Sequence, residues 1–230
     1  MKHENGMLRF SHQAMATEWE ILISHNDQLY AEQAARAAFD MLNRLEQDLS
    51  RFLPNSDISR INRATANEAV IVGVDTFECL HKCRQLHEQT FHAFDITTGR
   101  LIQYHKNSKK SGIPPDSGRI KSLHKNTGMH LLKLNESKKS VTKKAAELEL
   151  DLGGFGKGYA VDRMADELSE WDIRNFMIHG GMSSVYAAGK MKARNGWKIT
   201  ISHPESGRFL QRLLLTNVAL AASRLRKGRH

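Results

Sequence analysis

Residues 151–162 read DLGGFGKGYAVD and hold four glycines within six positions. Alternating leucines before this stretch (Leu148, Leu150, Leu152) predict a strand, and the residues from Tyr159 to Glu170 predict a helix. A glycine-rich turn between a strand and a helix presents backbone N–H groups and the positive end of the helix dipole, which suits a phosphate. Glycine lets the backbone approach the anion closely, and Lys157 adds a positive charge. The stretch therefore favours a nucleotide or its pyrophosphate as ligand.

The turn does not match the common nucleotide-binding motifs. It lacks the four-residue spacer of a Walker A loop, and Gly158 stands where Ser or Thr would hold magnesium. It also fails to fit G-x-G-x-x-G followed by an acidic residue. Taken alone, a glycine cluster is more often a tight turn than a ligand site, so the interpretation depends on the rest of the chain.

Length and composition are those of a soluble globular protein. The 230 residues, 40% hydrophobic and 26% charged, can form one core or one domain with two lobes. No apolar run approaches the roughly 20 residues that span a bilayer, and no signal segment is visible, so a cytoplasmic location is expected. Cys79 and Cys83 lie four apart on a predicted helix, and we expect free, half-buried thiols.

The net charge of +9 suggests acidic partners. Many of the excess lysines fall between Lys106 and Lys144, and further cations lie near the C-terminus. No aromatic residues are interleaved with them as base-stacking platforms would require. A solvated loop and a polar tail explain this pattern, which argues against a dedicated nucleic-acid surface.

Hydrophobic periodicity favours an α+β or mixed α/β fold, with helices first and strands later. Predicted helices are a long one starting after Asn26 or Asp27, a short one at 56–62, and one through Thr90 that Asp75 and Glu78 would cap. Residues 103–126 are polar and contain Pro114 and Pro115, which predicts a connector. Predicted strands cover residues 18–24, 129–134, 147–152, 175–178, 183–188, 197–202 and 210–215.

Six separated blocks together resemble the FAD:protein FMN transferases, the ApbE-type flavin transferases. They are MAT (15–17), LSRF with SDISRIN (49–62), AFDITTGRL (93–101), the glycine turn, HGG (179–181) and GWKI (196–199). The resemblance implies a two-lobed, mixed α/β ApbE-like fold with a ligand cleft between the lobes. It runs from about residue 14 to the last residue and implies a single domain, residues 1–230, that is C-terminally incomplete relative to the family.

The resemblance also implies an activity. Such a transferase moves FMN from FAD to a Thr or Ser hydroxyl of a target flavoprotein through a phosphoester, depends on magnesium and releases AMP. The expected partners are FAD and that target protein, with no nucleic acid and no transmembrane segment. One alternative is an FAD-binding protein that keeps the cleft without turnover, because an Asp and a Thr that bind magnesium in the family would follow His230. A generic nucleotide-binding module is another.

The same resemblance assigns site residues. His230 matches a catalytic histidine, and the backbone carbonyl of Gly156 matches a metal ligand. The cofactor-binding positions are Met15, Phe52, Ala93, Phe94, Asp95, Gly153, Lys157, Tyr159 and Ser223. Several have a structural alternative: Met15 could pack in the core, Asp95 could cap a turn and Lys157 could be solvated. His179 is expected to be structural.

Overall fold

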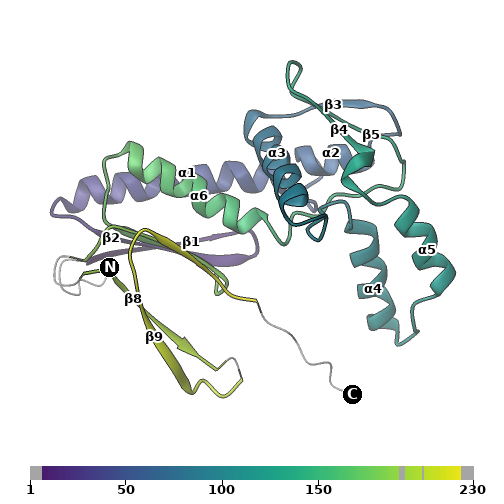
Figure 1. The fold of residues 1–230 in the computed structure, drawn as a ribbon. Helices are drawn as coiled ribbons and strands as arrows, with labels where there is room; N and C mark the ends of the chain where they lie inside the picture. The colour runs from purple at the N-terminus through teal and green to yellow at the C-terminus, as the bar shows by residue number, and fades with distance from the viewer. Residues whose placement is uncertain (1–6, 192–194, 204, 224–230) are drawn as a thin grey trace. The chain divides into compact units, whose positions relative to one another are not determined.

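A computed structural model of the chain describes residues 7–191, 195–203 and 205–223 (Figure 1). The chain forms two compact units, Met1–Arg44 with Lys157–His230, and Leu45–Gly156. Both units combine helices with strands, which confirms the predicted mixed class. In the described ranges no helix is long and apolar enough to cross a membrane. The predicted cleft between lobes stays a prediction.

The first unit is built on a five-stranded antiparallel sheet of order β1-β2-β6-β7-β10. Met15 and Ala16 join β1 to β2 with positive φ angles of 49° and 56°, as in the two-residue turns that suit hairpins. The strands are β1 (Met7–Ala14), β2 (Thr17–Ser24), β6 (Phe176–Gly180), β7 (Ser184–Ala188) and β10 (Val218–Ala221).

Helices α1 (Gln28–Leu49) and α6 (Gly156–Glu170) run across one face of this sheet (Figure 1). Asp27 caps α1, as predicted, by accepting a hydrogen bond from Tyr30 N at 3.0 Å. The opposite face packs against the hairpin β8 (Trp197–Ser202) and β9 (Phe209–Leu215). Buried side chains there include Met177, Val185, Ala187, Trp197 and Leu215. The first unit is thus a sheet with helices on one side and a hairpin on the other.

The second unit contains a three-stranded antiparallel sheet of order β3-β5-β4 and four helices. Its elements are α2 (Asp57–Arg63), β3 (Ala69–Ile71), α3 (Val74–Gln89), α4 (Gly99–Ser111), α5 (Ser117–Lys125), the 3₁₀ turn η1 (Met129–Leu131), β4 (Leu132–Asn135) and β5 (Ser140–Lys143). Cys79 and Cys83 face its interior as free thiols with no exposed surface, so they are fully buried rather than half-buried.

The predicted connector at residues 103–126 is wrong, because α4 and α5 fill most of it. Gly112 ends α4 in the left-handed conformation (φ 72°), and Asp116 caps α5 by accepting from Arg119 N at 2.7 Å. Each of these helices buries one leucine, Leu101 in α4 and Leu123 in α5, so the apolar pattern that would predict a helix is sparse. Lysines on the exposed sides made the segment resemble a loop.

Three further predictions need correction. The N-cap of α3 is Gly73 rather than Asp75, and Asp57 accepts from the N–H of Gly73 at 2.8 Å. Residues 147–152 do not form a strand. Within the described part of the chain they pair with another segment only at one isolated bridge, between Thr98 and Glu149. Residues 129–134 begin as η1 before becoming β4. The strands β1, β3, β5 and β10 were not predicted.

Candidate functional site

The glycine turn, residues 153–155, connects an extended segment to α6. Phe155 N and Gly156 N both donate to Leu152 O, at 2.9 and 2.7 Å, so the chain reverses sharply. Helix α6 consequently begins at Gly156, three residues before the predicted start. Asp151 Oδ1 accepts from Gly153 N at 2.7 Å. A Cβ on residue 153 would lie 2.9 Å from that oxygen, so this hydrogen bond requires glycine there.

The other side of the turn is open. A Cβ placed on Gly154 or on Gly158 would have no heavy atom within 4 Å, and both glycines are exposed. Bare backbone beside the first turn of a 15-residue helix is therefore accessible from solvent. Such an arrangement has the room and the dipole orientation that a phosphate group needs.

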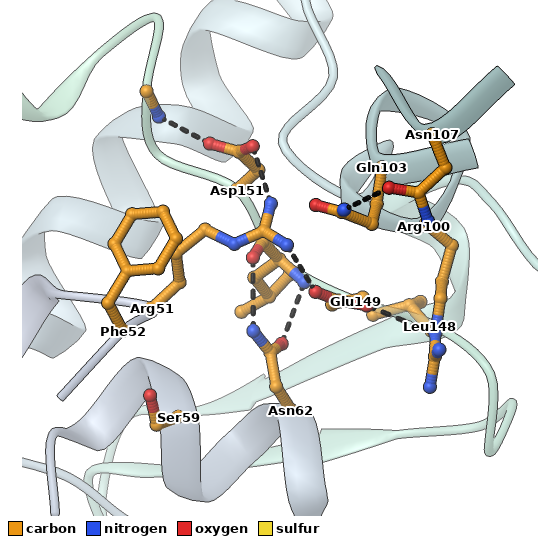
Figure 2. A network of polar contacts seen from close by, with 12 residues as sticks. Arg51, Phe52, Ser59, Asn62, Arg100, Gln103, Asn107, Leu148, Glu149 and Asp151 are labelled. Carbon is orange, nitrogen blue, oxygen red and sulfur yellow. Dashed lines mark hydrogen bonds and ion pairs between the residues drawn. The ribbon is translucent and has the colours of Figure 1, made fainter. Parts of the chain in front are cut away.

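A charged network holds the segment that leads into the turn (Figure 2). Arg51 donates from Nη1 to Asp151 Oδ2 and from Nη2 to Glu149 Oε1, both at 2.6 Å. Arg100 Nε lies 3.0 Å from Glu149 Oε2. The Arg51, Glu149 and Asp151 side chains are only 13%, 18% and 11% exposed, so screening by water is limited. Two guanidinium groups thus neutralise two carboxylates next to the turn.

Two more side chains fix the same segment through its backbone. Asn62 donates from Nδ2 to Leu150 O at 3.1 Å and accepts at Oδ1 from Leu150 N at 2.7 Å (Figure 2). Lys143 donates from Nζ to the carbonyls of Asn62 (2.7 Å), Ala146 (2.9 Å) and Leu148 (3.3 Å). Lys143 is 1% exposed, and burial lowers its pKa. These bonds replace the strand pairing that the leucine pattern predicts.

The AFD segment, residues 93–95, lies beside the glycine turn within the second unit. The rings of Phe94 and Phe155 are 6.1 Å apart between centroids, and Asp151 N donates to Ile96 O at 2.8 Å. Asp95 Oδ1 accepts from both Thr97 N (2.7 Å) and Thr97 Oγ1 (2.6 Å), which is the turn-capping role considered from the sequence. Ala93 is exposed in the same loop. The fold therefore brings two of the sequence motifs together.

Phe52 lies in the same unit as Phe94 and Phe155 and presents its ring to solvent. It is 83% exposed, and the Arg51 guanidinium carbon lies 5.6 Å from its ring centroid. The ring is therefore accessible from solvent. It is a suitable surface for a planar ligand to stack on.

The remaining predicted site residues belong mainly to the first unit, and the structure places each separately. Met15 lies in the β1–β2 turn, Lys157 in the first turn of α6, and Ser223 follows β10 as an exposed residue. Tyr159 is 1% exposed, so its side chain is buried. Gly156 is the first residue of α6. His230 lies outside the described residues.

His179 lies on β6 opposite Glu20 of β2. Burial lowers the pKa of His179; the Glu20 carboxylate opposes this shift and the Arg9 guanidinium adds to it. A neutral histidine inside a strand agrees with the structural role expected from the sequence.

A separate hollow of about 640 Å³ lies in the second unit, between α3 and the segment from Gly128 to Leu134. His87, His92 and Asp95 line it together with Arg84, Lys133 and Lys144. Of the predicted site residues, Asp95 lines this hollow. The described residues contain no group of three or more His, Cys, Asp or Glu that could hold a metal ion.

Sequence reasoning missed Arg51, Asn62, Lys143 and Glu149 as organisers of the site. Asn62 carries no local signal, because its partner Leu150 lies 88 positions away, and the contact of Lys143 with Asn62 spans 81 positions. Arg51 is part of the LSRF motif and directly precedes Phe52. Its position next to Phe52, an expected ligand residue, was the signal that could have identified Arg51 as part of the site.

Residues 15–225 match the model of the ApbE family. Among curated relatives, the FAD:protein FMN transferase of Chlamydia muridarum is 29% identical over 171 residues, covering 74% of this chain and 54% of that protein. The enzyme of the same name from Vibrio cholerae is 26% identical over 167 residues, covering 71% and 49%. The chain therefore spans about half the length of the curated relatives it matches.

Solved structures show the same fold. The flavin transferase ApbE from Vibrio cholerae aligns with a TM-score of 0.80 at 23% identity, covering 97% of this chain and 74% of that one. The ApbE protein from Thermotoga maritima aligns with a TM-score of 0.80 at 22% identity, covering 93% and 69%.

Proposed function

This chain belongs to the ApbE family, and on that premise we propose that it binds FAD and transfers the FMN part to a protein. The relatives that this chain matches over 54% and 49% of their length are named FAD:protein FMN transferase. That name supports FAD as the donor and a protein as the acceptor. The observation that carries the proposal is the open backbone at Gly154, beside a helix start and next to the AFD segment.

In the proposed binding mode, the glycine turn receives the pyrophosphate of FAD. Backbone N–H groups and the dipole of α6 favour the negative charge there. Glu149 and Asp151 would repel a pyrophosphate if they were free, but Arg51 and Arg100 neutralise them. Phe52 and Phe94 offer aromatic surface to the planar rings. Met15, Ala93, Asp95, Gly153, Lys157, Tyr159 and Ser223 remain proposed contacts.

The proposed chemistry is a phosphoryl transfer to a Thr or Ser of the acceptor. The hydroxyl oxygen forms a bond to the phosphorus of the FMN half. The bond from this phosphorus to the bridging oxygen breaks, and AMP leaves with that oxygen. The hydroxyl proton passes to a base, for which we propose His230. In such reactions most of the rate enhancement comes from positioning and from neutralising charge.

Magnesium dependence is a further part of the proposal. Among the described residues the carbonyl of Gly156 is the candidate ligand, whereas Glu149 and Asp151 are occupied by arginines. Mg²⁺ commonly binds through few protein ligands plus substrate phosphates and water. The described side chains alone do not form such a site, so no step of the transfer is assigned to the ion.

The test combines a binding and a turnover measurement. FAD is titrated against the protein by flavin fluorescence, and AMP is then measured after adding Mg²⁺ and a flavoprotein domain that contains an exposed Thr. We expect FAD binding, one AMP per modified acceptor, and an acceptor mass increased by one FMN moiety. FAD binding without AMP release under saturating Mg²⁺ would contradict the transfer step and favour a binding protein without turnover.

A further inference from the structure

The positive charge of this protein is concentrated in one helical hairpin, formed by α4, α5 and the loop between them (residues 99–125). These 27 residues contain seven Lys and Arg against one Asp, a net charge of +6 out of +9 for the whole chain. The other 203 residues are close to neutral, with 27 cations and 24 anions. The charge therefore marks a place on the surface and is not a general property of the composition.

The hairpin is an ordered element rather than a solvated loop. α4 and α5 lie alongside each other (Figure 1), and the Tyr104 hydroxyl accepts from Asp116 N at 2.9 Å to join the end of the loop to α4. Leu101 and Leu123 are buried at 7% and 3% exposure. The two helices thus hold their exposed side chains on a defined scaffold.

Most of the hairpin's cations have no acidic partner. Lys106, Lys109, Lys110, Lys121 and Lys125 are exposed, and none of them pairs with an acid in the part of the chain that the structure describes. Lys106, Lys109 and Lys110 have i, i+3 and i+4 spacing, so they lie on one side of α4. Lys121 and Lys125 likewise share a side of α5. Like charges so close together are unfavourable without a partner, which indicates a surface suited to an anion.

The hairpin is also connected directly to the candidate site. α4 starts at Gly99, four residues after Asp95 of the AFD segment. Arg100, in the first turn of α4, contacts Glu149, which Arg51 joins to Asp151 beside the glycine turn (Figure 2). A macromolecule bound to the hairpin would consequently lie near those proposed FAD-binding residues that belong to the same unit, such as Asp95.

We propose that the α4–α5 hairpin is the docking surface for the acceptor protein, and that it binds an acidic segment of that protein. The inference rests on the proposed function, since FMN transfer requires a protein to approach the site. A nucleic acid is less well matched, because the one Phe, Trp or Tyr of the hairpin, Tyr104, is engaged in joining the helices. Complementary charge steers such encounters and fixes their orientation.

The experiment measures binding of short fluorescein-labelled peptides by anisotropy, in NaCl at about 150 mM. One peptide carries a Thr flanked by Asp and Glu, and the other replaces these acids with Asn and Gln. The test variant combines Lys106→Glu, Lys109→Glu and Lys110→Glu. The control combines Arg36→Glu, Lys133→Glu and Lys138→Glu, which makes the same charge change at exposed positions outside the hairpin.

We expect the unaltered protein to bind the acidic peptide at least about tenfold more tightly than the neutral one. The α4 variant should lose about tenfold or more, and the control about threefold or less. Equal losses in both variants would overturn the proposal. A short DNA duplex or anionic phosphatidylglycerol vesicles that bind about tenfold more tightly than the acidic peptide, and lose binding in the same α4 variant, would also overturn it. FAD titration of the same proteins separates the two proposals, because the α4 variant should keep its FAD affinity even if peptide binding fails.

Discussion

Arg51 Nη1 lies 2.6 Å from Asp151 Oδ2, although the two residues are 100 positions apart in the sequence. Arg51 lies in the loop that follows α1, and its contact orients the Asp151 carboxylate. The same carboxylate accepts a hydrogen bond from Gly153 N. The second guanidinium nitrogen of Arg51 binds Glu149, so one side chain orients two acids around the glycine turn. The shape of the proposed pyrophosphate site depends on Arg51, and its local charge depends on Arg51 together with Arg100.

Replacing Arg51 with Met should destabilise the protein by about 2–4 kcal/mol, because Asp151 loses its cation in a poorly hydrated setting. Arg51→Lys should recover part of that loss, since a single ammonium cannot serve both carboxylates in the same geometry. Arg100→Met is the matched control: its side chain is 56% exposed, and its loss should stay below about 1 kcal/mol. Urea unfolding provides the comparison, and equal losses for the two methionine variants would show that the Arg51 contacts are not special.

Gly153→Ala and Gly154→Ala should behave differently although they are neighbours. A Cβ on residue 153 falls 2.9 Å from Asp151 Oδ1 and forces apart a hydrogen-bonded pair, whereas one on residue 154 meets nothing within 4 Å. We expect Gly153→Ala to lower the free energy of unfolding by about 1–2 kcal/mol and Gly154→Ala to change it by about 0.5 kcal/mol or less. Urea denaturation checks this, and similar values for both variants would refute the turn geometry.

Lys143→Met should be among the more damaging substitutions in the second unit. The change removes an ammonium that donates to three carbonyls, and it leaves the carbonyl of the buried Leu148 without this donor. The expected loss is about 2–4 kcal/mol. Lys144→Met is the control at the adjacent, exposed position, where we expect about 0.5 kcal/mol or less. Thermal unfolding compares the two variants. A Lys143→Met protein as stable as the control would show that the Lys143 hydrogen bonds do not stabilise residues 146–150.

His179 should make the protein less stable as the pH falls. Burial lowers the pKa of His179 below its ordinary value of 6.5, so the unfolded chain binds a proton that the folded chain does not. Its contribution is therefore complete above pH 6.5 and declines as the pH drops below it. His179→Gln should reduce the stability difference between about pH 7.5 and 5.5, by up to about 1 kcal/mol. A His179→Gln protein that responds to pH as the unaltered protein does would show that His179 is not the source.

Regular patterns predicted much of the fold. The long amphipathic α1 with its Asp27 cap, the short α2 behind Ser56, and strand β8 all follow from spacing and from local capping chemistry. The leucine pattern at residues 148–152 was misleading for a physical reason: alternating leucines are buried there, but side chains of Asn62 and Lys143 satisfy the backbone instead of a neighbouring strand. Contacts between distant residues leave no periodic signal.

The candidate site was predictable only in part. The glycine turn, Phe94 and Phe52 were visible as motifs, and the structure brings the first two together through the contact of Phe94 with Phe155. The charged network was not visible, because a salt bridge between Arg51 and Asp151 depends on how the chain returns after 100 residues. The basic hairpin was mistaken for a loop, since lysines cover the helical pattern of α4 and α5.

The most direct test of the central claim is the affinity of a Gly154→Leu variant for FAD, measured by flavin fluorescence. The Cβ of the new side chain would meet no heavy atom within 4 Å, so we expect little change in the free energy of unfolding. If the pyrophosphate binds there, FAD affinity should fall about tenfold or more, or about 1.4 kcal/mol, while riboflavin, which has no pyrophosphate, is unaffected. An unaltered FAD affinity in a stable Gly154→Leu protein would contradict the assignment of the glycine turn as the pyrophosphate site.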